Sequence, residues 1–371
     1  MRKILFLLFL TAASAVYSWN VNPVSLRERA AKEIPGWMKQ RITEDLLFFA
    51  PSSVTAISIA ETLSAVTSAQ GGEAAALVRV RMRHGFQEWE SPLNLNKNEI
   101  TRLESFLEGL RLLDSILPLP DLDFLVSLAD HYDRPLFLRF TKAPVFTVSK
   151  SIGNRKSIMF PKGLWNSERE VLFERICKSS ELYPWEFRYP QAFWRGSLSE
   201  GFYPYFEWDF KPRPRLVFFS RHNPDLLDAG FIQNQYLTQF HHLWQKWMDD
   251  NGFIKNEVSP EEQVAFQYLV AIDGAASPGS LVWQMFSQST ILKEVSSQKE
   301  WFYDALEPGV HYALFRNDSS DLKEVITSLR QNPRIAENMA RKAKEFAEEF
   351  LRDEGVFLFM YHLLQAYSSL L

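Results

Sequence analysis

The chain has 371 residues, which is long for one hydrophobic core and suits two domains of about 150 residues each. Hydrophobic residues make up 46% of the chain and charged residues 23%, so long disordered stretches are not expected. A formal net charge of −4 gives no electrostatic reason to expect nucleic acid or an anionic membrane as a partner.

The first residues have the pattern of a secretory signal peptide. Arg2 and Lys3 precede a short apolar run over 4–16, and Ala13-Ser14-Ala15 offers a small-x-small cleavage site. An uncleaved N-terminal anchor fits the same residues, and the sequence leaves both interpretations open. We therefore set residues 1–18 apart as a signal peptide or anchor, and we expect the protein to be exported or membrane-anchored through this segment.

Helix and strand patterns alternate in the N-terminal half. A periodic run over 97–117 predicts a helix, because Ile100, Leu103 and Leu110 share one face. The apolar run over 124–128 is typical of a buried parallel strand. Cys177, the single cysteine, allows no internal disulfide, and we expect it to be packed in a helix. Other predicted helices cover 25–49, broken at Pro35, and 167–179, and other predicted strands cover 75–83 and 144–149.

The C-terminal half repeats the alternation. Asn332-Pro333 is a typical N-cap and N1 pair, and it opens a final helix that runs towards Leu371 with a break near Gly355. The proline- and aromatic-rich stretch 201–214 predicts a loop. Two rounds of alternation favour an α/β fold with parallel sheets in two lobes. The predicted strands cover 191–194, 268–272, 290–293 and 311–315, and the predicted helices cover 224–228, 237–249, 279–287 and 321–331.

The run over 268–286 is the most informative stretch. An apolar strand ends at Asp273-Gly274, small residues follow, and a helix is predicted to begin near Pro278. Ligands of open α/β sheets bind beyond the carboxyl ends of strands, where small residues let a phosphate approach the main chain. A plain tight turn between strand and helix is the alternative.

A second predicted strand ends in a glycine and a serine, Gly196-Ser197. Arg213 and Arg215 follow it in the sequence. Guanidinium groups match the geometry of a diphosphate, so a strand-end serine with a nearby arginine is chemically sensible. Solvated surface arginines are the alternative.

Several ordered motifs together resemble glycosyltransferase family 90. They are FWRGS at 193–197, PRPRLVFFSRHNPDLLDAGF at 212–231 and DGAASPG at 273–279, and the run over 287–315 continues the likeness. The similarity is strong over 190–371 and weaker over 100–190. The family includes capsule-associated glycosyltransferases and the protein O-glucosyltransferases and O-xylosyltransferases of the secretory pathway.

The resemblance implies an α/β fold of the GT-B-like kind, with two Rossmann-like lobes and a long C-terminal helix. We expect an N-terminal acceptor-side lobe over 19–190 and a C-terminal nucleotide-sugar-binding lobe over 191–371. The implied activity is inverting, metal-independent transfer of a sugar from a nucleotide sugar, a UDP-sugar first of all, to an acceptor hydroxyl on a glycan, a lipopolysaccharide or a protein. The donor is a substrate, so no cofactor and no metal are implied, and peripheral membrane association stays open.

The family's functional residues map onto this sequence one by one. The base matches Asp130, with Asp133 as the fallback, because a carboxylate is needed to take the proton of an acceptor hydroxyl. Arg213, or Arg215 in its place, would neutralise the diphosphate. The other residues implied to bind the donor are Ser197, Gly274, Ala275, Ala276, Ser277 and Ser280.

Ser280 departs from the family's pattern. Many relatives carry an arginine on the helix after the small-residue loop, and this chain has Ser280 there. Either Lys293 or Arg213 supplies the missing charge, or the chain binds donors weakly. The departure motivates an alternative function, a catalytically silent member that acts as a carbohydrate-binding or surface protein.

Two further patterns could suggest a metal. Asp121-Leu122-Asp123 matches the DxD motif of other glycosyltransferases, but it precedes an apolar strand, whereas that motif follows one. His241-His242 occupy adjacent helical positions, which point about 100° apart, and no further ligand is evident.

Overall fold

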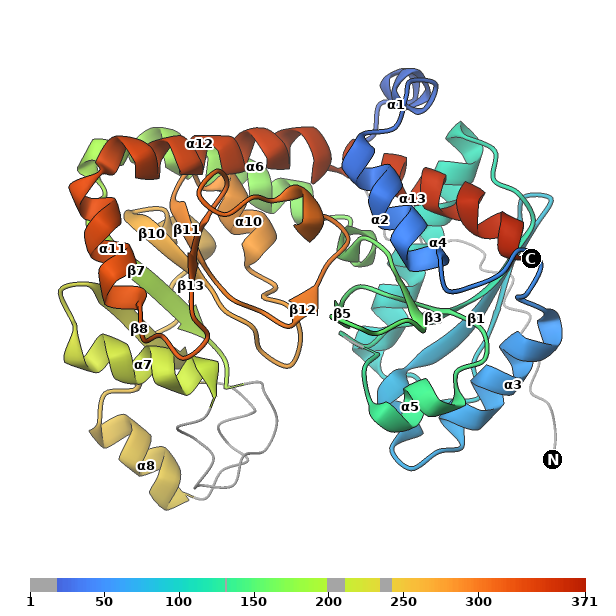
Figure 1. The fold of residues 1–371 in the computed structure, drawn as a ribbon, viewed down its shortest axis with the longest axis horizontal. Coiled ribbons are helices and arrows are strands. Elements are labelled where there is room, and N and C mark those ends of the chain that lie inside the picture. The colour runs from blue at the N-terminus through green and yellow to red at the C-terminus, as the bar shows by residue number, and fades with distance from the viewer. Residues whose placement is uncertain (1–18, 131, 199–210, 234–241) are drawn as a thin grey trace. The chain divides into compact units, whose positions relative to one another are not determined.

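The computed structural model describes residues 19–130, 132–198, 211–233 and 242–371. The chain divides into two compact units, each with its own sheet (Figure 1). Unit 1 comprises residues 1–170, 300–302 and 353–371, and unit 2 comprises 171–299 and 303–352. The predicted α/β class is confirmed. The division differs from the predicted boundary after residue 190, because most of α6 (Arg169–Leu182) belongs to unit 2 and α13 (Asp353–Tyr367) returns to unit 1.

The sheet of unit 1 is mixed rather than parallel throughout. The first strand, β1, lies antiparallel to both β2 and β3, whereas β3, β4 and β6 are parallel. A two-residue turn at His84 and Gly85, both with positive φ, joins β1 to β2, and such a turn makes a hairpin. In order across the sheet, the strands are β2 (Phe86–Glu90), β1 (Leu77–Arg83), β3 (Leu122–Ser127), β4 (Val145–Thr147) and β6 (Ser157–Met159).

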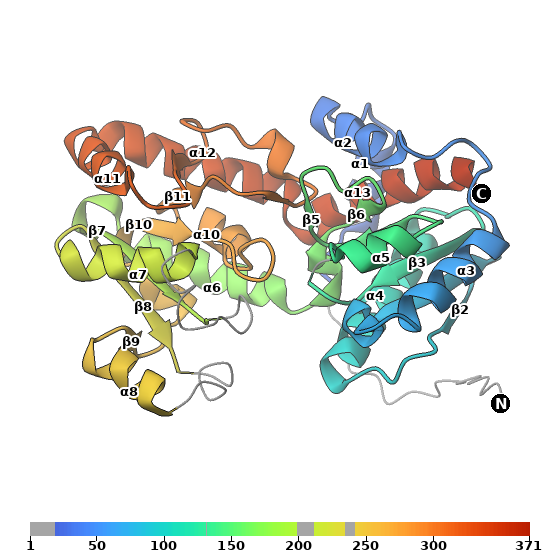
Figure 2. The ribbon, with the colours of Figure 1, turned by 60° about the horizontal axis from the view of Figure 1, so that its bottom comes forward.

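The helices of unit 1 cover its sheet. The predicted helix over 97–117 is α4 (Lys97–Ile116), which begins with a capping box between Asn96 and Glu99. Its predicted apolar face is buried, apart from Ile100, which is 43% exposed. Figures 1 and 2 show α3 beside α5 and α2 beside α13. The other elements among the described residues of this unit are α1 (Pro23–Ala30), α2 (Gly36–Leu46), α3 (Ala56–Thr67), α5 (Pro135–Phe140), β5 (Lys150–Ser151) and the 3-10 helices Gly72–Ala75, Lys162–Trp165 and Ser368–Leu370.

The sheet of unit 2 is parallel in every strand pair that the structure describes. The strands follow the order β13-β11-β10-β7-β8-β9. From β7 the chain adds β8 and β9 on one side, then crosses over and adds β10, β11 and β13 on the other, so the order reverses between β7 and β10. The bounds are β7 (Tyr189–Gly196), β8 (Leu227–Ile232), β9 (Ile254–Lys255), β10 (Phe266–Ala271), β11 (Thr290–Glu294) and β13 (Ala313–Phe315).

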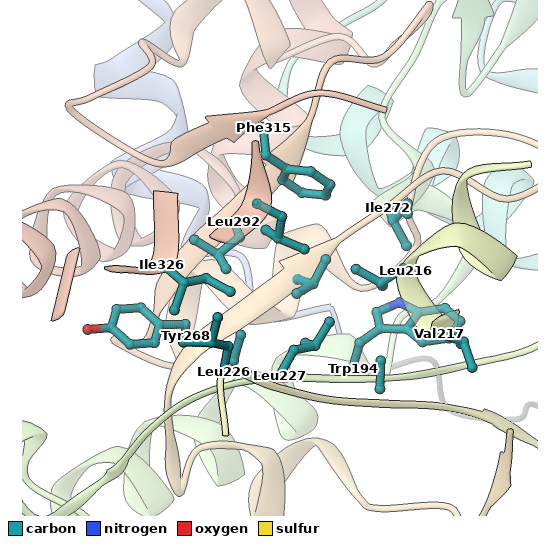
Figure 3. Close-up of a cluster of buried hydrophobic side chains, with 14 of the residues drawn as sticks. Trp194, Leu216, Val217, Leu226, Leu227, Tyr268, Ile272, Leu292, Phe315 and Ile326 are labelled. Atoms are coloured by element: carbon teal, nitrogen blue, oxygen red, sulfur yellow. The ribbon is translucent and has the colours of Figure 1, made fainter. Parts of the chain in front are cut away.

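Helices pack on both faces of this sheet. In Figure 1, α6, α10 (Leu281–Phe286) and α12 (Pro333–Phe350) lie above the strands, and α7 (Pro212–His222) lies below them. Figure 3 shows part of the buried cluster beneath the sheet, where Leu216 and Val217 of α7 meet Trp194 of β7. The remaining elements among the described residues of this unit are α8 (His242–Asp250), α9 (Pro260–Gln263), α11 (Leu322–Gln331), β12 (Gln298–Lys299) and the 3-10 helices Trp185–Phe187 and Tyr303–Ala305.

Two predictions in unit 2 are wrong. The helix predicted over 224–228 is replaced by β8, whose residues Leu227, Ala229 and Phe231 are buried. Residues 212–214, predicted as loop, form the first turn of α7, where prolines are tolerated because the first N–H groups of a helix have no partner within it. Residues 201–210 of that predicted loop lie outside the described residues.

Candidate functional site

The reversal of strand order gives unit 2 a topological switch point between β7 and β10. Ser197 directly follows β7, and Asp273 and Gly274 follow β10. The two strands are hydrogen-bonded neighbours and parallel, so their carboxyl ends meet at one edge of the sheet. Ligands of open α/β sheets bind in the crevice at such a point.

Arg213 connects the two strand ends. Its guanidinium donates from Nη1 to the main-chain oxygen of Ser197 at 2.6 Å and from Nε to that of Asp273 at 2.8 Å. The guanidinium also lies 5.7 Å from the ring centre of Trp194. Arg213 is in the first turn of α7, within residues that were predicted as loop. The structure thus brings Arg213, Ser197 and the start of the small-residue loop together, with the guanidinium bound to main-chain oxygens.

The loop after β10 is compact. Gly274 donates its N–H to the oxygen of Ala276 at 2.9 Å. Ala276 and Ser277 are buried, whereas Ala275 is exposed and Ser280 is half-buried. Ser280 directly precedes α10, which begins two residues later than predicted. A β-carbon built on Gly279 would meet no atom within 4 Å, so the space beside this glycine is open.

Buried charges lie behind this loop. Glu294, 1% exposed at the end of β11, accepts a hydrogen bond from the N–H of Asp273, and the hydroxyl of Ser296 donates to the Asp273 carboxylate. Burial raises the pKa of Asp273 above its usual value, and the Ser296 hydrogen bond and the charges of Lys293 and Arg213 only partly offset it. We did not predict Glu294, although a carboxylate closing a buried strand was a usable signal.

Lys293, a candidate for the missing cation, is 6% exposed. Its ammonium lies 4.6 Å from the ring centre of Tyr303 and 3.5 Å from the main-chain oxygen of Glu294. The Lys293 side chain is therefore held inside unit 2 by its contacts with Tyr303 and Glu294. Arg215, the substitute for Arg213, lies one turn into α7. The pKa of Asp318 is lowered mainly by hydrogen bonds with Ser320, and the charge of Arg215 adds a smaller effect in the same direction.

Asp130 lies in unit 1, just beyond β3. Its Oδ1 accepts from Nη2 of Arg102 at 3.1 Å and from Nζ of Lys162 at 3.4 Å. Its main-chain oxygen accepts from the hydroxyl of Ser149, which follows β4, at 2.7 Å. The side chain remains 45% exposed. The carboxyl ends of parallel strands thus bring Asp130 and Lys162 together, and neither Arg102 nor Lys162 was predicted.

Both carboxylate oxygens of Asp133, the fallback base, accept hydrogen bonds from nearby residues of unit 1. Its Oδ2 accepts the N–H of Ser151 at 2.9 Å, and its Oδ1 accepts from the amide of Asn154 at 2.6 Å. Asn154 is itself buried and also donates to the oxygen of Tyr132. Both oxygens of Asp133 therefore fix the turn between β5 and β6.

The remaining polar motifs have structural partners. Asp123 accepts both arms of Arg79, at 2.7 and 2.5 Å, and Asp121 accepts the N–H of His84. No group of three or more potential metal ligands occurs among the described residues. His241 and the side chain of His242 lie outside them. Cys177 is buried, as predicted, and burial raises its pKa to about 11.

The fold and the site together define a Rossmann-like α/β unit that carries polar side chains at its topological switch point. The sequence matches the family model for glycosyl transferase family 90 over residues 105–371, which is more than half of the chain. The chain belongs to glycosyl transferase family 90.

Relatives with assigned names are distant in sequence. O-glucosyltransferase rumi of Drosophila pseudoobscura pseudoobscura is 26% identical over 281 residues, covering 70% of this chain and 63% of that protein. Protein O-glucosyltransferase 1 of Rattus norvegicus is 25% identical over 279 residues, covering 70% and 65%. The chain thus spans less than two thirds of the length of these two relatives.

Among solved structures, Anabaena Alr3699/HepE in complex with UDP-glucose is similar with a TM-score of 0.41. The identity is 13%, and the match covers 63% of this chain and 65% of that one. The family assignment rests on the sequence matches.

Proposed function

We propose that this chain is a glycosyltransferase that moves a sugar from a nucleotide sugar to an acceptor hydroxyl. The donor is a UDP-sugar, for which glucose is the first choice because the named relatives are O-glucosyltransferases. The acceptor is a glycan, a lipopolysaccharide or a protein. The transfer is inverting and needs no metal ion.

The observation that carries this proposal is the switch point of unit 2. Family membership raises the expectation of a glycosyl donor, and the meeting of β7 and β10 is where an α/β unit of this topology binds a nucleotide. Ser197, Arg213 and the loop from Gly274 to Ser280 would line the donor's diphosphate. Arg213 would act chiefly by holding both strand ends in place, because its described hydrogen bonds go to main-chain oxygens.

Asp130 is the proposed base. The carboxylate takes the proton from the acceptor hydroxyl, and the acceptor oxygen forms a bond to the anomeric carbon from the side opposite the nucleotide. The bond between the anomeric carbon and the donor's phosphate oxygen breaks, and the nucleoside diphosphate leaves with that electron pair. Attack from the opposite side inverts the anomeric configuration.

A second candidate function is a catalytically silent family member that binds carbohydrate. Ser280 favours it, because no arginine stands there to neutralise the leaving diphosphate, and Lys293 is buried beside Tyr303. The two candidates differ in one measurable property, which is whether sugar is transferred.

The decisive variant is Asp130→Asn, which keeps the size of the side chain and removes its basicity. We expect kcat to fall by about 10²–10⁴-fold, the usual contribution of a general base, with donor affinity unchanged. Lys142→Met, which removes an exposed ion pair with Glu61 elsewhere in unit 1, is the matched control and should keep full activity. Full transfer by Asp130→Asn would rule out the proposed role of this carboxylate.

A thermal-shift panel of nucleotide sugars tests the donor separately. A ligand present at 100 times its Kd should add about 2.7 kcal/mol to the stability of the protein. A shift with a UDP-sugar and transfer to an acceptor support the enzyme. A response to glycans alone supports the silent binder.

We also propose that residues 1–18 direct export or anchoring. These residues lie outside the described part of the chain, within which no helix is long and apolar enough to cross a bilayer. N-terminal sequencing of the mature protein tests this, since a cleaved signal peptide predicts a new N-terminus just after Ala15.

A further inference from the structure

Two cations converge on one oxygen of Asp130. The guanidinium of Arg102 and the ammonium of Lys162 approach Oδ1 at 3.1 and 3.4 Å. They come from different elements, since Arg102 is on α4 and Lys162 opens the 3-10 helix at Lys162–Trp165. Arg102 lies 28 residues before Asp130 and Lys162 lies 32 residues after it, so only the fold brings the three together.

The position of Arg102 is fixed by contacts other than the carboxylate. Its Nη1 donates to the main-chain oxygen of Leu128 at 2.7 Å, just after β3. The guanidinium carbon lies 4.4 Å from the ring centre of Trp165, which is 6% exposed. A cation held over a buried indole and by a carbonyl keeps its place without help from the group that it binds. A freely moving surface arginine has neither contact.

We propose that Arg102 is a positioning residue for Asp130. Lys162 assists it, and the ring of Trp165 supports its guanidinium. This inference rests on the proposed role of Asp130 as the base. Arg102 donates hydrogen bonds both to the carbonyl of Leu128 and to the carboxylate of Asp130. It therefore fixes the orientation of this carboxylate relative to the end of β3. The two positive charges also favour the ionised carboxylate, which is the form that can accept a proton.

The balance of the proton step is unchanged by this role. The proton of the acceptor hydroxyl moves to the Asp130 carboxylate, and Arg102 and Lys162 keep their own protons throughout. Besides these two cations, the charged side chain nearest along the same loop is Asp133, whose oxygens are bound to Ser151 and Asn154. His131 lies outside the described residues.

An ordinary surface ion pair is the competing explanation, because Asp130 is 45% exposed and Arg102 is 30% exposed. Such a pair contributes little to the stability of a protein, and its loss should leave kcat unchanged. A positioning residue predicts a change in kcat and in its pH dependence, with donor KM unchanged. The two explanations therefore differ in kcat and its pH dependence, which a small loss of stability would not change.

The experiment compares Arg102→Met, Arg102→Lys and Lys162→Met with Lys142→Met as the control, after Asp130→Asn has been assayed. We expect Arg102→Met to lower kcat by about tenfold to a hundredfold. We also expect it to move the acidic limb of the kcat profile up by about one pH unit, since an opposite charge near a carboxyl has an effect of that size. Arg102→Lys should keep the limb near its original pH and lower kcat, because the charge stays and the two-armed hydrogen bonding is lost. Lys162→Met should give a smaller shift in the same direction.

The outcomes are distinguishable. If Asp130→Asn keeps full activity, the proposed function of the carboxylate fails and this inference fails with it. If Asp130→Asn is inactive while folded Arg102→Met keeps the parent kcat and pH profile, the positioning role alone is overturned. Circular dichroism and melting temperature identify a variant that is simply unfolded, in which case Arg102→Lys, which preserves the charge over Trp165, decides the question by its kcat.

Discussion

Arg213 donates to the main-chain oxygen of Asp273 across 60 residues of sequence, at 2.8 Å, and the same guanidinium reaches the oxygen of Ser197. We predict that Arg213→Lys lowers stability by about 1–3 kcal/mol, because a compact ammonium lacks the planar fork that places separate N–H groups on the two oxygens. It should also weaken binding of a nucleotide sugar, since both strand ends become less ordered. Urea unfolding and donor titration measure the two effects.

Arg221→Lys is the matched control for this variant. Arg221 is exposed on the same helix and bonds a single main-chain oxygen, that of Asn251. Its replacement should leave donor binding unchanged. Equal donor affinity in Arg213→Lys and Arg221→Lys would contradict the role given to Arg213.

The second prediction concerns a buried charge cluster in unit 1. Oδ1 of Asp45 accepts from Arg41 at 2.7 Å and from Lys150 at 2.6 Å, and its Oδ2 accepts the N–H of Met159 at 2.8 Å. All three charged side chains are at least nine-tenths buried. Asp45→Ala removes the buried carboxylate that Arg41 and Lys150 share, and we expect a loss of about 3–5 kcal/mol.

Glu44→Ala provides the comparison, because Glu44 pairs with the same Arg41 from a position where it is 41% exposed. Its removal should change stability by less than about 1 kcal/mol. A global melting curve averages over both units, whereas hydrogen exchange in β6 reports the stability of unit 1 itself. Similar exchange rates in the two variants would argue against a buried cluster.

The third prediction is a pH effect on stability at Asp273. Burial raises the pKa of this carboxyl in the folded protein, so the folded chain binds more protons than the unfolded chain between the ordinary value, about 3.9, and the raised value. The stability contribution of Asp273 is therefore lost as the pH rises through that interval. Asp273→Asn should make the protein more stable at pH 7 than the parent, with little difference at pH 3.5. Unfolding free energies from pH 3.5 to 8 check this.

Asp228 should behave in the opposite way. Burial alone would raise its pKa, but hydrogen bonds and charges from Arg195 and Lys255 outweigh that effect and lower it. A depressed pKa gives stability that is present above the unfolded value and is lost as the pH falls through the folded value. Asp228→Asn should therefore destabilise the protein at pH 7 and lose its effect as the pH falls through the lowered pKa of the folded protein. A uniform destabilisation at every pH would point to lost packing instead.

Much of the fold could be predicted because its elements have clear periods. The helix α4 has a long apolar stripe, and β10 and β11 are short apolar runs followed by polar residues. The strand β8 was mistaken for a helix because a run of a few apolar residues after Asn223-Pro224 fits a buried strand and a helix start equally well. The antiparallel pairing of β1 and β3 joins residues that are 40 to 50 positions apart in the sequence, which no local pattern encodes.

The candidate site was predictable to a similar extent. Ser197 and Gly274 were found because each lies shortly after a predicted strand, and the carboxyl end of a strand is a position that the sequence reveals. Asp130, just beyond β3, was assigned through the resemblance to the family. Arg102 and Glu294 were missed for a different reason. Both act through neighbours distant in sequence, and as isolated residues on a helix and at a strand end they resemble many others.

The return of α13 to unit 1 has a consequence for how the protein is made. Tyr367 is fully buried, its ring packs against Phe124 of β3 and Phe146 of β4, and its hydroxyl donates to the main-chain oxygen of Asp123. A ribosome therefore completes all of unit 2 before it supplies the helix that finishes the core of unit 1. The core of unit 1, which contains the first described residues to be synthesised, can be completed only after all of unit 2 has been made.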